Sequence, residues 1–333
     1  METAFDVAEL VGYGYRADDF YEVGREKVRE YARAVQDFHP AHWHESSAGE
    51  LGYAGLPVPA TFASIVAMQA NQALLGGVLT GYDTFVHTDQ VFEMYQPILA
   101  GDRLLIDVEL SAVRRVAGKD LLTITNTFTD GSGRVVQVMH TTVVGITDAD
   151  VAAGIGEAIE GVIMSGLTAP APPASAPGHD LQHSEVSRTR TPRTAIRFED
   201  IAVGDELPAR TVRLTRGDLV NYAGVAGDAN PIHWNEGIAA LAGLPDVIAH
   251  GMLSMGLGAG FVTGWLGDPG AVLRYGVRLS NYAVVDAATA GTVEFTGRIK
   301  STDPQTRTAT VVLIAKSAGR KIFGLATMDV RLT

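Results

Sequence analysis

Apolar positions along the chain change their spacing in the same order twice. Apolar residues at helical spacing run from about Glu26 to Val35 and end in a proline turn, and a charge-free apolar stretch follows from about 61 to 75. A second charge-free stretch runs from about 251 to 265. Because neither stretch has a charged face, both are expected to be helices covered on nearly all sides.

After each charge-free stretch, apolar and polar residues alternate as they do in strands. In the first half, strands are expected at 84–92, 103–113, 121–129 and 134–144. In the second half, they are expected at 210–214, 274–282, 291–300, 306–315 and 321–332. A buried helix followed by an antiparallel meander, twice over, predicts an α+β fold in which each sheet wraps its helix.

The two halves also share a local sequence. At a shift of 191 residues the matched or similar pairs are Tyr31/Tyr222, Ala32/Ala223, Val35/Ala226, Asp37/Asp228, Pro40/Pro231, His42/His233 and Trp43/Trp234. Each turn is followed by a Gly-Leu-Pro element, at 55–57 and 243–245. A repeat this long predicts paired domains rather than a solenoid. We expect a first domain at 1–150, a linker at 151–195 that is rich in Pro and Ala between Thr168 and His179, and a second domain at 196–333.

Composition narrows the class of protein. The chain is 46% hydrophobic and 19% charged, and its N-terminus lacks the features of a signal peptide, so we expect a cytoplasmic globular protein without a membrane span. The absence of cysteine excludes disulfides, thiolate nucleophiles and zinc-thiolate sites.

Charge is spread unevenly along the chain. A net charge of -12, with 21 acids against 10 bases in residues 1–150, argues against a nucleic-acid partner. Seven arginines between Arg188 and Arg216 are a local exception. They could attract an acidic partner, but a solvated linker and strand edge is the preferred interpretation.

An acid and an imidazole flank the Asn-Pro turn of the second half. Asp228 and His233 stand five residues apart around Asn230 and Pro231. The residue before a proline is pushed out of helix, so both side chains could lie on one wall of a cleft and share a water molecule or a substrate hydroxyl. Two titratable groups placed in this way suit general acid-base chemistry.

The motif D-A-N-P-I-H at 228–233, followed by A-H-G-M-L at 249–253, resembles the hydratase motif of the MaoC-like (R)-specific enoyl-thioester hydratases and dehydratases. Residues 197–333 look like the catalytic subunit, and residues 6–146 like the substrate-binding subunit, of the two-subunit (3R)-hydroxyacyl-ACP dehydratases that elongate mycolic acid precursors. The resemblance implies a double hotdog in one chain, a pseudo-dimer with a degenerate, acyl-binding first half and a catalytic second half.

The resemblance also implies roles for single residues. It carries the catalytic dyad onto Asp228 and His233, and the oxyanion donor onto the amide of Gly251. A backbone N–H at a helix start suits negative charge on a thioester oxygen, and His233 is the preferred base for the α-proton. Supporting or substrate-binding roles fall to Asn230, Met252 and Ser254. Many relatives have a serine where this chain has Ala259, so a polar contact from this helix to the carboxylate of Asp228 would be missing, and Ser254 is the candidate substitute for it.

The implied activity is reversible dehydration of (3R)-3-hydroxyacyl thioesters to trans-2-enoyl thioesters, without a cofactor or a metal. The substrate would be carried on acyl carrier protein in fatty acid elongation, or on coenzyme A in oxidation or polymer precursor supply. A hotdog thioesterase or a non-catalytic acyl-binding subunit would also be consistent with such a fold, and homodimerisation stays open.

Asp37 and His42 keep the spacing of the dyad in the first half, but the features around them differ. His39 stands in the place of Asn230, and the V-P-A-T-F at 58–62 has no His-Gly-Met. We therefore expect inherited scaffold here rather than a second active site. A metal site formed by His39, His42 and His44 is not expected, because Pro40 breaks the helical spacing that would direct His39 and His42 to one point. In the second half, His250 is expected to pack or to orient the helix start.

Overall fold

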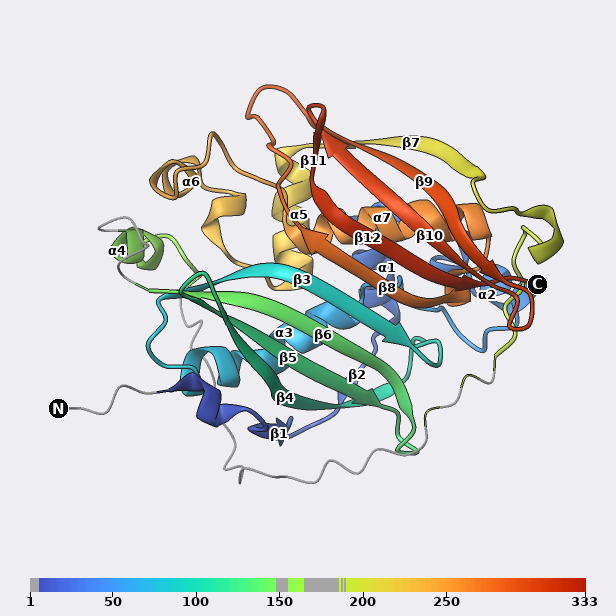
Figure 1. The fold of residues 1–333 in the computed structure, drawn as a ribbon, viewed down its shortest axis with the longest axis horizontal. Helices are drawn as coiled ribbons and strands as arrows, with labels where there is room; N and C mark the ends of the chain where they lie inside the picture. Colours follow the sequence, from blue (N-terminus) through green and yellow to red (C-terminus); the bar gives the residue numbers. More distant parts are fainter. Residues whose placement is uncertain (1–5, 148–154, 165–185, 187, 189) are drawn as a thin grey trace.

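One continuous sheet carries both halves of the chain. The computed structural model describes residues 6–147, 155–164, 186, 188 and 190–333. Twelve strands form the sheet, and helices α3 and α7 lie on the same face of it (Figure 1). This arrangement confirms the predicted α+β class and the wrapping of sheet on helix. The predicted Pro/Ala-rich stretch at 168–179 lies outside the described residues.

The first half begins with short elements and ends in long strands. Its helices are α1 (Arg25–Ala34), α2 (Glu45–Glu50) and α3 (Ala63–Ala73), with 3-10 helices at Val7–Leu10 and Pro40–His42 and a π-helical turn at Leu74–Val78. Its strands are β1 (Gly14–Arg16), β2 (Tyr21–Glu22), β3 (Thr84–Met94), β4 (Arg103–Val116), β5 (Lys119–Thr129) and β6 (Val135–Ile146). The pattern of residues did not predict β1 and β2, because two or three residues are too few to show alternation.

The second half repeats this order after a short helix α4 (Ile155–Glu160). Its helices are α5 (Arg216–Ala226), α6 (Glu236–Leu241) and α7 (Gly251–Leu266), with 3-10 helices at Phe198–Asp200, Pro231–His233 and Pro269–Ala271. Its strands are β7 (Glu206–Leu214), β8 (Val272–Leu279), β9 (Gly291–Asp303), β10 (Thr308–Ser317), β11 (Arg320–Lys321) and β12 (Phe323–Arg331). The expected strand at 274–282 therefore ends too late, and the one at 321–332 is interrupted at Ile322.

Strands β3 and β8 join the two halves. The strand order is β1-β4-β5-β6-β3-β8-β12-β10-β9-β7, and β3 runs antiparallel to β8 with Val91 opposite Gly276. These two residues are 185 positions apart. The same separation relates Ile98 to Ala283: Ile98 accepts a backbone hydrogen bond from Val58, and Ala283 accepts the equivalent one from Ala249. At the junction, Val91 therefore pairs with Gly276, its equivalent in the second half. The approximate two-fold axis that relates the halves passes between these two residues.

The two long helices differ in how completely they are covered. All of α7 is buried except Gly251, Gly264 and Trp265, as its charge-free sequence predicted. Helix α3 is less enclosed than predicted, because Gln69 is exposed and Met68 is half-buried. The prediction that a helix without charged residues is buried on all sides is therefore correct for α7 and wrong for α3.

Three glycines of α7 allow close approach of other elements. A Cβ at Gly256 would lie 2.5 Å from Val35 Cγ1, and one at Gly260 would lie 3.3 Å from Asp37 Cγ, both in the first half. A Cβ at Gly258 would lie 2.8 Å from the hydroxyl of Tyr275 on β8. The close approach expected from these glycines is made by the protein's own side chains. Glycine lets α7 fit between the sheet and the first half.

The repeat keeps its spacing of 191 residues beyond the turn. Pro57 forms an isolated bridge with Leu99, and Ile248 forms the corresponding one with Val284. Gly52 and Gly243 both have positive φ, at 84° and 73°. The Gly-Leu-Pro elements at 55–57 and 243–245 are therefore not at equivalent positions, and their agreement in sequence is coincidental.

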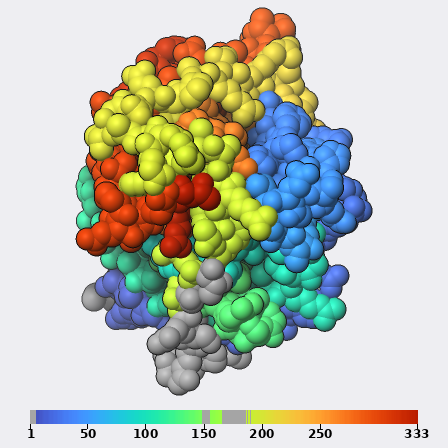
Figure 2. Space-filling model, turned by 90° about the vertical axis from the view of Figure 1, so that its right-hand side faces the viewer, coloured from blue at the N-terminus to red at the C-terminus, as the bar shows by residue number. Residues whose placement is uncertain are grey.

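The arginine-rich segment ties the two halves together (Figure 2). Arg190 pairs with the fully buried Asp268 at 2.8 Å and donates to the carbonyl of Leu51, while Arg193 donates to that of Glu50. Arg197 and Arg216 have carboxylate partners as well. Most of these cations are thus engaged within the chain, which favours the structural interpretation of the segment. Among the described residues, none of the helices has both the length and the apolar character needed to cross a bilayer.

Candidate active site

The turn after α5 fixes Asp228 and His233 on one short loop. Helix α5 ends at Gly227, which has a left-handed φ of 75°. The side chain of Asn230 then caps the 3-10 helix Pro231–His233 by accepting from the N–H of Ile232 at 3.2 Å. The backbone N–H of Asn230 donates to Asp228 Oδ1 at 3.3 Å. Asn230 therefore fixes the turn and reaches Asp228 through its main chain.

His233 is held in a defined tautomer. Its side chain is 7% exposed, and Nδ1 lies 2.8 Å from the carbonyl oxygen of Ile248. A carbonyl can only accept, so Nδ1 carries the proton and Nε2 keeps its lone pair. Burial lowers the pKa of His233, while the charge of half-buried Asp228 acts in the opposite direction. A neutral imidazole with a free Nε2 is suited to take a proton.

His250 completes a group of three ionisable side chains. Its ring stacks on that of His233 with centroids 3.8 Å apart and an interplanar angle of 27°, and the ring of Tyr222 lies 4.8 Å from it. Burial and the neighbouring His233 keep the pKa of His250 well below its usual value. Among the described residues, neither ring nitrogen of His250 makes a hydrogen bond of good geometry, although the nearby backbone of Asp228 acts to raise its pKa. His250 therefore packs at the helix start as a neutral ring.

The ligand atoms of Asp228, His233 and His250 all lie within 4.8 Å of one another. A metal ion would need these lone pairs to converge on one point. Rings stacked nearly face to face direct their lone pairs along similar lines, and Nδ1 of His233 is already committed to Ile248. The arrangement fits proton transfer better than it fits tetrahedral coordination.

Helix α7 starts beside the dyad. His250 is its N-cap and Gly251 is its first residue, so the N–H of Gly251 belongs to the first turn, whose amides have no partner within the helix. These amides and the helix dipole favour negative charge. A Cβ on Gly251 would lie 2.6 Å from Leu279 Cδ1. A larger residue here would therefore require the end of the Leu279 side chain, on the last residue of β8, to shift.

The two other residues predicted to support the site lie in the first turn of α7. Ser254 is buried and donates to the carbonyl of His250 at 3.2 Å, so its hydroxyl is engaged with the helix backbone and does not replace the missing contact to Asp228. Met252 is 7% exposed and belongs to the continuous hydrophobic core.

Asp37 and His42, the first-half counterpart of the dyad, keep the same backbone contact of the histidine, but their two side chains face each other directly. His42 Nδ1 donates to the carbonyl of Pro57 at 2.7 Å, and Nε2 lies 3.3 Å from Asp37 Oδ2. Burial alone would raise the pKa of Asp37 and lower that of His42. The attraction between the two outweighs it and shifts both pKa values the other way. Both side chains are at most 3% exposed.

Helix α7 packs directly on this first-half carboxylate, since Gly260 is the glycine that faces Asp37. Helix α3 begins only at Ala63, so Ala60, the counterpart of Gly251, precedes the helix instead of starting it. His39 caps its turn by accepting from the N–H of Ala41. The first-half pair is thus a buried ion pair without a helix-start amide next to it.

His87 of β3 lies near the dyad, and no pattern of residues predicted it there. Burial lowers its pKa, while the charge of Asp228 raises it, so the two groups are close enough to interact. The β3–β6 register shifts between His87 and Asp89, which marks an irregularity in the strand at this point. The first half therefore contributes a side chain to the surroundings of the second-half site. A strand pattern cannot show such proximity, because it depends on the β3–β8 junction.

A solved structure described as a MaoC-like dehydratase is similar to this chain over nearly its whole length. The two are 55% identical with a TM-score of 0.91, and the match covers 98% of this chain and 100% of that one. This chain belongs to the MaoC-like dehydratase family. Within this MaoC-like dehydratase, residues 197–317 match the family described as "MaoC like domain", and residues 9–139 match "FAS1-like, dehydratase domain region".

Two proteins of Mycobacterium tuberculosis are also similar to this MaoC-like dehydratase. A UPF0336 protein is 39% identical over 145 residues, which are 43% of this chain and 92% of that protein. A conserved hypothetical protein described as having a double hotdog fold is 13% identical, with a TM-score of 0.62 and coverage of 97% of this chain and 96% of that one. The second likeness concerns the fold alone, and with the joined sheet it confirms the predicted double hotdog.

Proposed function

We propose that this MaoC-like dehydratase reversibly dehydrates (3R)-3-hydroxyacyl thioesters to trans-2-enoyl thioesters at Asp228 and His233. The observation that carries the proposal is the tautomer of His233. With Nδ1 bonded to Ile248, the free Nε2 is left beside the Asp228 carboxylate and the first turn of α7. A base, a group for the hydroxyl and an oxyanion donor are the three parts that this elimination needs.

In the dehydration direction, His233 Nε2 takes the α-proton of the substrate. The negative charge that develops on the thioester oxygen is stabilised by the N–H of Gly251 at the positive end of α7. The C–O bond at the β-carbon then breaks, and the hydroxyl leaves as water with the proton passed from His233 through Asp228. One proton and one hydroxide leave together, so the dyad returns to its starting state.

The first half is proposed to bind the acyl chain. Its own dyad is closed under α7, whereas the later part of α3 stays partly open, with Gln69 exposed. His87 of β3 reaches the surroundings of Asp228 from the same half. These features support an acyl channel that runs from the dyad toward α3 and β3. On this view residues 1–150 bind the acyl chain, and residues 196–333 carry out the dehydration.

We propose acyl carrier protein as the carrier of the substrate. The match of residues 9–139 to a fatty-acid-synthase-like dehydratase region supports a role in fatty acid elongation. The arginine-rich segment adds little to this argument, because most of its cations have partners within the chain. Rates on enoyl-ACP and enoyl-CoA of equal chain length would decide between the carriers, and a higher rate on enoyl-CoA would contradict this part of the proposal.

The central test is hydration of trans-2-enoyl thioesters, followed by loss of enoyl absorbance and by a thiol assay. His233→Ala and Asp228→Asn should each lower the rate by about 10²- to 10⁴-fold. His42→Ala is the matched control from the first half, with rates expressed per folded protein, and it should keep activity within a few fold. Equal loss in the His42 and His233 variants would contradict a single site, and thiol release without loss of enoyl absorbance would indicate a thioesterase.

A further inference from the structure

A cavity in the first half lies at the position that corresponds to the proposed active site of the second half. Its walls include Pro57 to Ala60 and Met94 to Ile98, which are the counterparts of Ile248 to Gly251 and of Leu279 to Ala283. The other walls come from the second half, at Pro269–Gly270 and Val272–Leu273. The cavity has a volume of about 50 Å³, enough for a few water molecules or one small anionic group.

Two buried donors that line this cavity have no partner. Gln137 of β6 is 4% exposed, and among the described residues its Nε2 makes no hydrogen bond. Nη1 of Arg190 is also buried and unpartnered within the described part of the chain. Buried donors are almost always satisfied by protein, water or a ligand, so two of them around one cavity indicate that something with acceptor atoms occupies it.

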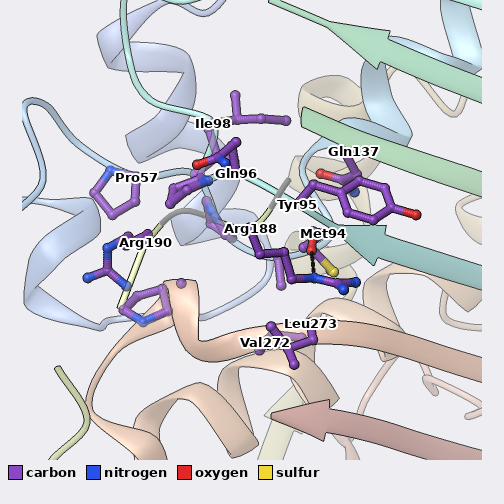
Figure 3. A pocket seen from close by; sticks show the side chains of 16 residues that line it. Pro57, Met94, Tyr95, Gln96, Ile98, Gln137, Arg188, Arg190, Val272 and Leu273 are labelled. Carbon is purple, nitrogen blue, oxygen red and sulfur yellow. Dashed lines mark hydrogen bonds between the residues drawn. The ribbon is translucent and has the colours of Figure 1, made fainter. Parts of the chain in front are cut away.

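The charge beside the cavity is positive. Arg190 is compensated by Asp268 at 2.8 Å. Arg188 lies over the ring of Tyr95 at 4.8 Å, and Nε donates to the carbonyl of Met94 at 3.0 Å (Figure 3). The nearby carboxylate of Glu93 accepts from the hydroxyl of Tyr95 and faces Arg274 at 3.7 Å. Two guanidinium groups against the single carboxylate of Asp268 leave a net positive charge at the rim.

From these contacts we infer that the cavity is a binding site for an anionic group, a carboxylate or a phosphate, separate from the dyad. Arg190 Nη1 and Gln137 Nε2 would donate to its oxygens, and Arg188 would supply charge at the entrance. Pro57, Ile98 and Val272 give the remaining wall an apolar character, which suits a ligand with a short apolar body next to its anionic end. The anion site would then lie in the first half at the position that corresponds to the proposed thioester site of the second half.

The test measures binding of inorganic phosphate and of butyrate to the full chain by calorimetry. Saturable binding of either probe is expected. Gln137→Met, which keeps the shape of the side chain, removes a donor to a charged group, and Arg188→Ala removes the positive charge at the entrance. Each should weaken binding on the order of tenfold or more. Arg193→Ala is the matched control: an exposed arginine that also bonds a main-chain carbonyl, Glu50, but lies outside the cavity. It should bind as the wild type does.

A further variant separates the cavity from the proposed active site. His233→Ala should bind the probe with unchanged affinity, since its side chain is not part of the cavity wall. Preference for phosphate or for butyrate would identify the anionic group. The inference is overturned if neither probe binds saturably, which would mean that water alone satisfies the two donors. Binding that is lost with His233→Ala and kept with Arg188→Ala and Gln137→Met would also overturn it.

Discussion

The rings of His233 and His250 stack with centroids 3.8 Å apart, and both are buried beside Asp228. Two imidazoles in such contact cannot both be charged without strong repulsion, and burial lowers the pKa of each, so the neutral form of both rings is favoured. His250 is the more deeply buried of the two, at 1% exposed, and its ring nitrogens make no hydrogen bond of good geometry among the described residues. Burial in the folded protein and the neighbouring His233 therefore keep His250 neutral, and unfolding would restore its ordinary pKa.

Acid should destabilise the protein through His250. Its folded pKa lies well below the ordinary value near 6.5, so the unfolded chain binds a proton that the folded chain does not. The stability from the neutral ring is present above pH 6.5 and is lost as the pH falls below it, by up to about 1.4 kcal/mol per pH unit. His250→Phe should reduce the loss of unfolding free energy between pH 7.5 and 5.5 in urea titrations. Equal losses in both proteins would contradict the assignment.

The pH dependence of turnover should report His233. Its lowered pKa predicts that kcat/KM stays level as the pH falls to about 6.5 and declines only below that value. Asp228 raises this pKa, so the residual activity of Asp228→Asn should decline at a still lower pH. A decline that moves upward in the variant would show that another group is the base.

Alanine substitutions at Gly256 and Gly264 of α7 should change the free energy of unfolding in opposite directions. A Cβ at Gly256 would collide with Val35, so Gly256→Ala should lower the free energy of unfolding by about 1–3 kcal/mol. A Cβ at Gly264 would meet nothing within 4 Å, so Gly264→Ala should raise it by about 0.5–1 kcal/mol. Thermal unfolding of the two variants makes the comparison, and similar shifts in both would contradict the packing of α7.

Gly251 packs against Leu279 and is also proposed to present its amide to the substrate, and a pair of variants can separate these two roles. Gly251→Ala should lower kcat, because a methyl group would push Leu279 and alter the first turn of α7. Adding Leu279→Ala makes room for that methyl group. If the double variant regains activity, packing explains the defect. If it stays inactive while its Tm matches that of Leu279→Ala alone, the close approach of substrate to the amide explains it.

The buried pair of Asp37 and His42 should matter for stability and little for catalysis. Asp37→Asn removes one partner and leaves the other without its counter-charge, which costs about 3–5 kcal/mol for pairs buried as deeply as this one. Urea unfolding should show this loss, while hydration activity per folded molecule should stay near that of the wild type. Loss of activity in fully folded Asp37→Asn would instead indicate a second site.

The repeat and the helical spacing were sufficient to predict most of the architecture. The dyad turn, α7 and the meanders depend on local patterns, so they could be read from the residues. The junction could not be predicted in register, because Val91 and Gly276 meet only through the pairing of two whole halves. His87 escaped notice for the same reason, as did the engagement of Ser254 with its own helix, which depends on a rotamer.

The β3–β8 junction also has a consequence for stoichiometry. Each half alone would leave an edge strand with unpaired N–H and C=O groups, which is a template for misassembly. Joined in one chain, the halves are always synthesised in equal number and meet at a high local concentration. Neither half has to recognise a copy of itself. The first half could therefore close its Asp37–His42 pair under α7 without affecting the groups that we propose to be catalytic in the second half.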